Sequence, residues 1–300
     1  MFERILLPLD GSELAEAALP YARNLAEQLE AEIYLIHICP PEHQFYTHMH
    51  QIYLNSIQER MLQKINAGRT AASEKKIQAE VLVGDPVKAI FDFIKMKKIN
   101  LVALTTHGNS GFKPWAMGNV ADKIVRGSGI PTLLIRINSQ KDLKVRRANI
   151  QNILVPLDIS EVSKTALPYA IELAQKLKAG IHLFSMAQTA FAQSLDSTGA
   201  GIGINWSEVD KASEKGVNEF LEKTKAEVSQ LGIPVEYSSI LGIDAAFEIL
   251  EIEKKGKVDM LVMATRGRSS IARWAFGSVA EKVLREGNLP ILLIKEKPAG

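Results

Sequence analysis

The 300-residue sequence has little of several features that mark large classes of protein. It contains one cysteine, Cys39, so no disulfide can form within the chain and a reducing compartment is expected. Aromatic residues make up only 6%, and 36 basic residues against 34 acidic ones give a formal charge of +2. A nucleic-acid binder usually has a stronger basic excess or a set of stacking side chains. We therefore expect no nucleic-acid partner.

Long apolar runs are also lacking. No segment approaches the ~20 apolar residues that a membrane-spanning helix needs. The apolar run at residues 5–9 is too short for the central region of a signal peptide. Together with the single cysteine, these absences predict a cytoplasmic protein with no membrane partner. The remaining composition, 46% hydrophobic and 23% charged, is typical of a globular protein.

The most informative feature that is present is an internal repeat. Residues 4–38 and 152–186 are identical at roughly half of their positions without a gap, and residues 106–135 match residues 265–294. Such a period is too long for a solenoid and predicts two tandem domains of one fold. We assign domains to residues 1–138 and 150–300, joined by a polar linker at 139–149. The basic residues of this joint could also bind an anion, but a solvated linker is the favoured interpretation.

The second copy is longer than the first around residues 187–210. Gly199, Gly201 and Gly203 in this insert have the spacing of part of a dinucleotide-binding fingerprint. No apolar strand precedes them and no clear helix follows closely, so the context that the fingerprint requires is missing. We expect the insert to be a mobile surface loop.

Each copy alternates short apolar runs with amphipathic helical patterns. In the first copy, strands are expected at residues 5–9, 33–38, 79–83, 101–105 and 132–137, with helices that include 52–73 and 118–126. Ser12 is an expected N-cap, and Pro20 predicts a kink in the helix that follows. This order predicts an α/β fold of two tandem doubly wound, Rossmann-like domains, each with a five-stranded parallel sheet flanked by helices.

Ligands of doubly wound sheets bind beyond the carboxyl ends of the strands, where the strand order reverses. Glycine lets a backbone N–H approach an anion closely, a helix N-terminus offers unpaired donors, and a carboxylate suits ribose hydroxyls or a metal that bridges phosphates. Three segments of each copy combine these features. In the first copy they provide Pro8, Asp10, Leu104, Thr105, Gly108, Gly118, Asn119 and Val120; in the second they provide Pro156, Asp158, Met263, Ala264, Gly267, Gly277, Ser278 and Val279.

The same residues also have a purely structural interpretation. Gly108 and Gly267 can be turn glycines, Asn119 and Ser278 can be helix N-caps, and the two aspartates can cap the first helix of each copy. Neither copy has a P-loop or a dinucleotide fingerprint in context. The residues alone therefore leave both interpretations open.

Both copies resemble the universal stress protein family, and the pair resembles its tandem, two-domain form. The resemblance rests on LPLDGSELAEAAL and THGNSGFKPWAMGNVADKIV in the first copy, and on VPLDISEVSKTAL and TRGRSSIARWAFGSVAEKVL in the second. With the strands, these motifs cover most of the chain. They imply the nucleotide-binding α-hydrolase-like form of the fold.

The resemblance also implies a ligand, ATP or AMP, possibly held with Mg²⁺ or Mn²⁺. ATP-binding members carry a glycine, two residues, a second glycine, nine residues and then Gly-Ser or Gly-Thr. The second copy keeps Gly267 and Gly277-Ser278 with Ala264 at the first glycine; the first copy keeps Gly108 and Gly118, with Thr105 and Asn119 at the two other positions. The second copy is thus the stronger candidate. An adenine pocket is implied near Ile38 and Leu104, or near Met186 and Met263.

Three functions remain in view from the sequence. The leading hypothesis is a cytoplasmic stress-response protein that binds adenine nucleotide and changes an unknown protein partner or its assembly. The resemblance implies that strands 132–137 and 291–295 pair, which would make the chain an intrachain pseudo-dimer and leave a further homodimer open. A nucleotide-free interaction scaffold is favoured by the missing first glycines, and a slow ATPase only by Asp10 and Asp158 as metal ligands.

Histidines form a further cluster after the second strand, at His37, His43, His48 and His50. Such spacing could hold zinc or copper if the segment were extended. We favour solvated loop histidines, because no second cysteine or aspartate completes a ligand set and the segment is expected to start a helix.

Overall fold

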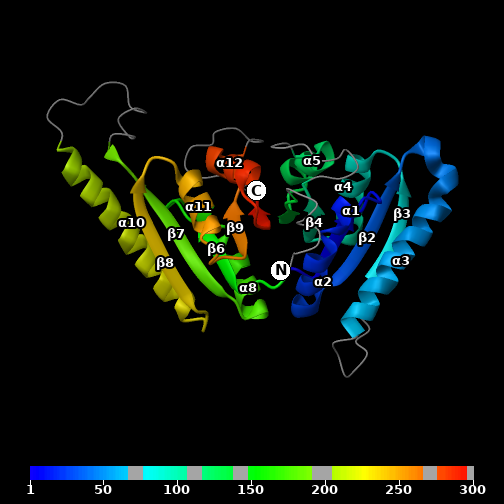
Figure 1. Cartoon of the computed structure of the whole chain (residues 1–300), viewed down its shortest axis with the longest axis horizontal. Coiled ribbons are helices and arrows are strands. Elements are labelled where there is room, and N and C mark those ends of the chain that lie inside the picture. Colours follow the sequence, from blue (N-terminus) through cyan, green and yellow to red (C-terminus); the bar gives the residue numbers. More distant parts are fainter. Residues whose placement is uncertain (67–76, 107–116, 138–147, 191–204, 266–275, 296–300) are drawn as a thin grey trace. The chain divides into compact units, whose positions relative to one another are not determined.

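The computed structural model describes residues 1–66, 77–106, 117–137, 148–190, 205–265 and 276–295 (Figure 1). By its contacts, the chain divides into two compact units. The first unit contains Met1–Asn149 together with Asn288–Gly300, and the second unit contains Ile150–Gly287. Each unit is a mostly parallel sheet covered by helices, as the sequence predicts. The domain bounds proposed from the sequence remain a prediction.

The first copy of the repeat alternates strands and helices in the expected order. Its elements are β1 (Arg4–Pro8), α1 (Glu13–Glu16), α2 (Leu19–Leu29), β2 (Glu32–Cys39), the short 3-10 helix η1 (Pro41–Tyr46), α3 (Thr47–Asn66), β3 (Ile77–Val83), α4 (Pro86–Lys97), β4 (Leu101–Thr105), α5 (Asn119–Gly127) and β5 (Thr132–Ile135).

The second copy repeats this order. Its elements are β6 (Asn152–Pro156), α7 (Glu161–Lys164), α8 (Leu167–Leu177), β7 (Gly180–Gln188), α10 (Trp206–Ser229), β8 (Val235–Gly242), α11 (Ala245–Lys254), β9 (Met260–Ala264), α12 (Ser278–Glu286) and β10 (Ile291–Ile294).

The sheet of the first unit has the strand order β3-β2-β1-β4-β5-β10. Strands β1 to β5 are parallel, and β1 lies between β2 and β4, with Ile5 opposite both Ile33 and Leu101. Strand β10 pairs with β5 in antiparallel orientation, so the expected pairing of the last strands of the two copies is present. Since chain connections run outward in opposite directions from β1 and β4, the strand order reverses between these two strands.

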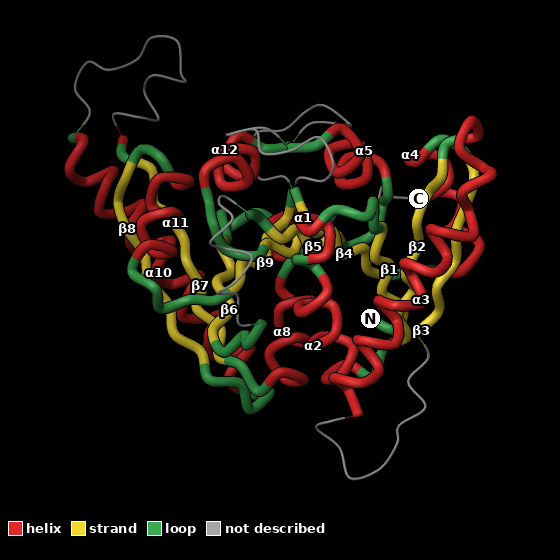
Figure 2. The backbone as a smooth tube through the Cα atoms, turned by 45° about the vertical axis from the view of Figure 1, so that its right-hand side comes forward, coloured by secondary structure: helices red, strands yellow, loops and turns green. Residues whose placement is uncertain are grey.

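The strands of the second unit have the order β9-β6-β7-β8, all parallel where they pair. Here the reversal lies between β6 and β9. Helix α10 lies along β7 and β8, as α3 lies along β2 and β3 in the first unit (Figures 1 and 2). Helices α11 and α12 contact each other, as do α4 and α5. The two units therefore repeat the same layering of helices on their sheets.

Local sequence explains where the first helices begin. Ser12 caps α1 and Ser160 caps α7, each accepting a hydrogen bond from a backbone N–H three residues later. The kink expected at Pro20 is a full break, because α1 ends before Leu19 and Pro20 occupies the first turn of α2. Proline is tolerated there, since a first-turn N–H has no partner within the helix.

Two sequence-based expectations need correction. The insert expected as a loop at 187–210 is regular at both ends, because β7 continues to Gln188 and α10 begins at Trp206; its glycine-bearing part lies outside the described residues. The helix expected at 52–73 begins earlier, at Thr47, and is described to Asn66. Among the described helices, none is long and apolar enough to cross a membrane.

Candidate functional site

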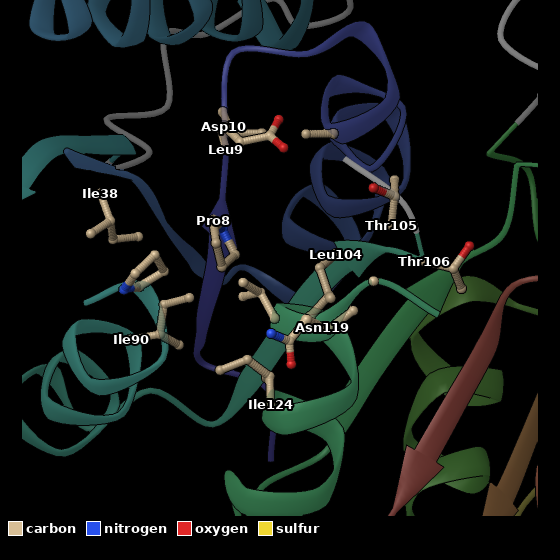
Figure 3. Close-up of a pocket in the computed structure, with 15 residues that line it drawn as sticks. Pro8, Leu9, Asp10, Ile38, Ile90, Leu104, Thr105, Thr106, Asn119 and Ile124 are labelled. Carbon is tan, nitrogen blue, oxygen red and sulfur yellow. The ribbon is translucent and has the colours of Figure 1, made fainter. Parts of the chain in front are cut away.

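A pocket of about 320 Å³ opens at the carboxyl ends of β1 and β4, where the strand order of the first unit reverses (Figure 3). Helices α4 and α5 complete its walls. The residues that line it are Pro8, Leu9, Asp10, Ala15, Ile38, Pro86, Ile90, Leu104, Thr105, Thr106, Gly118, Asn119, Val120, Ala121 and Ile124.

Glycine at position 118 lets α5 begin directly against the end of β4. The Gly118 N–H donates to the Thr106 carbonyl oxygen at 2.7 Å. A Cβ at this position would lie 3.3 Å from the same oxygen, which is tighter than ordinary contact. The N-cap glycine supplies no side chain to bond the first turn of α5, so the amide groups that follow it face the pocket without a side-chain cap.

The walls of this pocket differ in polarity. Figure 3 shows Ile90 and Ile124 at one end, with Pro8, Ile38 and Leu104 between, and the Asp10 carboxylate at the opposite end. An apolar floor with a few polar groups at one side is typical of a small-molecule site.

Asp10 also has a structural task. Its Oδ1 accepts hydrogen bonds from the Ser12 backbone N–H at 3.0 Å and from the Ser12 hydroxyl at 2.6 Å. Ser12 in turn caps α1, with its Oγ 3.1 Å from the Ala15 nitrogen. The capping interpretation of this aspartate is therefore correct in part, because Asp10 orients the residue that caps the helix.

The second unit has a pocket of about 440 Å³ at the equivalent place, beyond β6 and β9. The residues that line it are Pro156, Leu157, Asp158, Ile159, Ser163, Phe184, Met186, Ala187, Gln188, Ser213, Val217, Ala245, Ile249, Met263, Ala264, Gly277, Ser278, Val279 and Ala280.

The start of α12 is built as in the first unit. The Gly277 N–H donates to the Thr265 carbonyl oxygen at 2.8 Å, and the first bond within the helix runs from the Glu281 N–H to the Gly277 oxygen. Gly277 provides no side-chain cap. The backbone N–H groups of Ser278, Val279 and Ala280 therefore precede the first acceptor within the helix, and all three residues line the pocket.

Asp158 repeats the role of Asp10. Its Oδ1 accepts hydrogen bonds from the backbone N–H, at 3.1 Å, and the hydroxyl of Ser160, the N-cap of α7. The Asp158 N–H donates to Ser163 Oγ at 3.2 Å. These bonds fix the loop after β6, so that one carboxylate stands at the rim of each pocket.

Every described residue that the sequence singled out for nucleotide binding lines one of the two pockets. The first pocket gathers Pro8, Asp10, Ile38, Leu104, Thr105, Gly118, Asn119 and Val120, and the second gathers Pro156, Asp158, Met186, Met263, Ala264, Gly277, Ser278 and Val279. Gly108 and Gly267 lie outside the described residues.

Sequence reasoning missed the walls that the neighbouring helices provide. Pro86 and Ile90 come from α4, and Ala245 and Ile249 come from the equivalent α11. A signal was present, because each of these helices follows a strand directly and must begin at the same edge of the sheet. Ser213 and Val217 of α10 had no such signal, since the insert obscured where that helix begins.

The histidines are arranged differently from a metal site. His37 lies buried in β2, and its ring stacks on that of His50 of α3, with centroids 4.0 Å apart and planes at 16°. His37 Nδ1 lies 2.9 Å from the Leu9 carbonyl oxygen. Burial, and next the charge of His50, lower the pKa of His37. His37 is thus not a solvated loop histidine as expected, whereas His43 and His48 are exposed; within the described ranges no cluster of three or more metal-ligating side chains occurs.

Comparison with known proteins gives a consistent result for both copies. The model of the universal stress protein family matches residues 1–136 and again residues 149–295. A universal stress protein of Methanocaldococcus jannaschii is 28% identical over 146 residues, which cover 49% of this chain and 82% of the relative. One of Bacillus subtilis is 28% identical over 153 residues, which cover 45% of this chain and all of the relative.

Solved structures match the whole chain in fold. The crystal structure of a universal stress protein from Archaeoglobus fulgidus aligns with a TM-score of 0.69 at 20% identity, over 98% of this chain and 99% of that one. That of a putative universal stress protein from Pseudomonas aeruginosa aligns with a TM-score of 0.66 at 15% identity, over 99% and 94%. The two family matches span nearly the entire chain, which therefore belongs to the universal stress protein family as a tandem of two of its domains.

Proposed function

We propose that this protein is a stress-response protein that binds an adenine nucleotide, ATP or AMP, as a regulatory ligand in the second pocket. The observation that carries the proposal is the start of α12, where three successive backbone N–H groups without an acceptor in the helix line the pocket. Helix N-termini of this kind bind phosphate through these donors and the helix dipole. The Ser278 hydroxyl adds a further donor at the same place.

The rest of the pocket suits the nucleoside. Its volume of about 440 Å³ lies within the ~300–1,000 Å³ range of small-molecule sites. In the proposed pose, the adenine lies on Met186 and Met263, and the ribose hydroxyls bond to Asp158. If Mg²⁺ or Mn²⁺ accompanies the nucleotide, Asp158 is the carboxylate of this pocket that would help to hold it, and the ion would offset the charge of the phosphates.

The first pocket is the weaker candidate. It is smaller, about 320 Å³, and carries Thr105 and Asn119 where the second has Ala264 and Ser278. Threonine adds bulk where the ligand should approach the backbone. We propose that this pocket, at Pro8, Asp10 and Gly118, binds the nucleotide more weakly or not at all.

We further propose a cytoplasmic location and a role without catalysis. The hydroxyls that donate to Asp10 and Asp158 belong to Ser12 and Ser160, which cap the helices that follow, and we assign no catalytic residue. Binding would instead change a protein partner or the formation of a homodimer. An interaction scaffold without nucleotide is the alternative, and it is favoured by Ala264 and Thr105 at the position of the family's first glycine.

The test begins with the purified protein and no added ligand. Denaturation followed by mass spectrometry should release ATP, ADP or AMP, and added ATP should raise the melting temperature. Gly277→Val should abolish both effects, because its side chain would stand at the start of α12 within the pocket. The backbone at Gly277, with φ −65° and ψ 149°, is allowed for valine, and circular dichroism of the variant distinguishes lost binding from lost folding.

The matched control is Gly118→Val, at the equivalent position of the first pocket. We expect it to leave most of the nucleotide bound. Released nucleotide near one per chain indicates one working site, and near two per chain indicates that the first pocket also binds. An empty protein whose melting temperature does not respond to millimolar ATP would refute nucleotide binding and favour the scaffold.

A further inference from the structure

The two pockets differ in one wall. In the second unit, Ser213 and Val217 of α10 line the pocket. Helix α3 holds the equivalent place in the first unit, yet none of the described residues that line the first pocket belongs to it. The pocket with the helical wall is also the larger one, at about 440 Å³ against about 320 Å³.

The buried positions of the two helices indicate which residues correspond. Three of the four buried residues of each helix share one spacing, Leu54, Met61 and Ile65 of α3 with Val217, Thr224 and Val228 of α10, while Ile57 and Leu221 differ by one position. On the strands, the repeat aligns β2 with β7 without a gap. These alignments pair three ring-bearing residues with three small ones: His37 with Ser185, His50 with Ser213, and Tyr53 with Gly216.

In the first unit the rings fill the space between β2 and α3. His37 and His50 stack with centroids 4.0 Å apart, and His37 is anchored to the carbonyl of Leu9, a residue that lines the first pocket. The Tyr53 hydroxyl donates to Glu16 Oε1 at 3.1 Å. The stacked histidine rings thus lie between β2 and α3, and no described residue of α3 reaches the lining of the first pocket.

In the second unit small residues take the places of these rings. Ser213, at the place of His50, lines the pocket, whereas Gly216, at the place of Tyr53, is exposed on α10. The Ser185 hydroxyl oxygen is buried and, within the described part of the chain, has no hydrogen-bond partner. A buried hydroxyl of this kind calls for an explanation, such as an ordered water molecule or ion that satisfies it.

We propose that two of these positions determine which unit can hold the nucleotide: Ser185 and Ser213 leave the α10 side open for the purine base, whereas the stacked rings of His37 and His50 exclude the base from the first pocket. This inference rests on the proposed nucleotide binding and assigns the difference between the pockets to specific side chains. The Ser213 hydroxyl lies on the wall that the base would face.

The test transfers rings between the units in the full chain, with ATP and Mg²⁺ as the probe in equilibrium dialysis. Ser213→His places a first-unit ring in the second pocket, and we expect it to weaken ATP binding at least tenfold, whereas Gly216→Tyr adds a ring outside the residues that line the pocket and should bind like the wild type. Both positions tolerate the change, since Ser213 is half-buried and Gly216 is exposed on a helix. Lys211→His, which adds the same ring on an exposed position of α10, should bind like the wild type.

The reciprocal variant combines His50→Ser with Tyr53→Ala and should raise the number of ATP molecules bound per chain. Unchanged ATP affinity in Ser213→His, while the wild type binds ATP, would overturn this inference and leave the proposed function intact. A wild type that binds no ATP would overturn both. Circular dichroism of each variant distinguishes lost binding from lost folding.

Discussion

The helices that carry the outer walls of the pockets depend on two equivalent N-caps, Asp85 and Asp244. The Asp85 side chain accepts a hydrogen bond from the Lys88 N–H at 2.9 Å, and the Asp244 side chain accepts one from the Phe247 N–H at 3.1 Å. Asp244 has an additional partner, since Lys282 of α12 pairs with its second oxygen. We predict that alanine at either cap loosens the helix that follows it.

The expected magnitude follows from these contacts. Loss of an aspartate N-cap costs about 1 kcal/mol, within a range of about 0.5–2 kcal/mol. The ion pair of Asp244 adds little, because the side chains of Lys282 and Asp244 are 37% and 45% exposed. We therefore expect Asp85→Ala to cost about 1 kcal/mol and Asp244→Ala slightly more. Asp244→Asn should cost less than alanine, since asparagine keeps the capping oxygen.

The dependence on pH provides an internal check. The hydrogen bond from Lys282 is the main cause that holds the pKa of Asp244 below its ordinary value of 3.8. A carboxyl group with a lowered pKa in the folded state stabilises the protein above its unfolded-state pKa and loses this contribution as pH falls through the folded-state value. The difference in free energy of unfolding between the wild type and Asp244→Ala should thus be constant near pH 7 and decrease below pH 3.8.

Amide hydrogen exchange, read by mass spectrometry on α4 and α11 separately, measures the effect in each helix. A loss of about 1 kcal/mol corresponds to exchange about fivefold faster in the affected helix, and to a melting temperature lower by roughly 2–4 °C. Asp244→Ala should lose slightly more helix stability than Asp85→Ala, and this additional loss should disappear in 1 M salt, where the charges of Asp244 and Lys282 are screened. Unchanged exchange in α11 of Asp244→Ala at pH 7 would refute the reasoning.

Two further predictions concern buried polar groups. Ser185→Ala should leave the free energy of unfolding unchanged or raise it, because the lost hydroxyl has no partner in the described structure. Ser163→Ala should lower the free energy of unfolding by about 1 kcal/mol, because the Ser163 hydroxyl donates to the Ser160 oxygen at 2.9 Å. Urea unfolding at pH 7 checks both variants, and an equal loss in the two would contradict this account. Burial lowers the pKa of His37 below 6.5, so its contribution to stability is present above pH 6.5 and is lost as pH falls toward the lower folded-state value. His37→Gln should therefore flatten the decline in stability between pH 7 and 5, and an unchanged slope would count against it.

Much of the fold could be predicted because each short strand is apolar along its whole length. Strands buried on both faces leave this signature, and the repeat doubles the information for every element. The pockets followed from the same logic, since parallel strands end at one edge and the glycines at 118 and 277 stand directly before helices.

What could not be predicted depends on packing between segments distant in sequence. The sequence predicted a helix from Ile52, yet the side chain of Ile52 is 66% exposed and the helix begins five residues earlier, at Thr47. The stacking of His37 on His50 joins a strand to a helix, and no periodicity in either segment indicates it. The wall formed by Ser213 was hidden for the same reason.

The pairing of β5 with β10 bears on how the chain is made as well as on its final form. The register places Leu134 opposite Ile291, so the outer edge of β5 receives its partner only after roughly 160 further residues have been synthesised. At about 5–20 residues per second, a ribosome needs on the order of ten seconds or more for that length. During this interval the nascent first unit carries an unpaired apolar strand, the kind of edge that other chains can join. Early interruption of translation, or truncation before residue 291, should therefore produce an aggregation-prone fragment and not an independent half-protein.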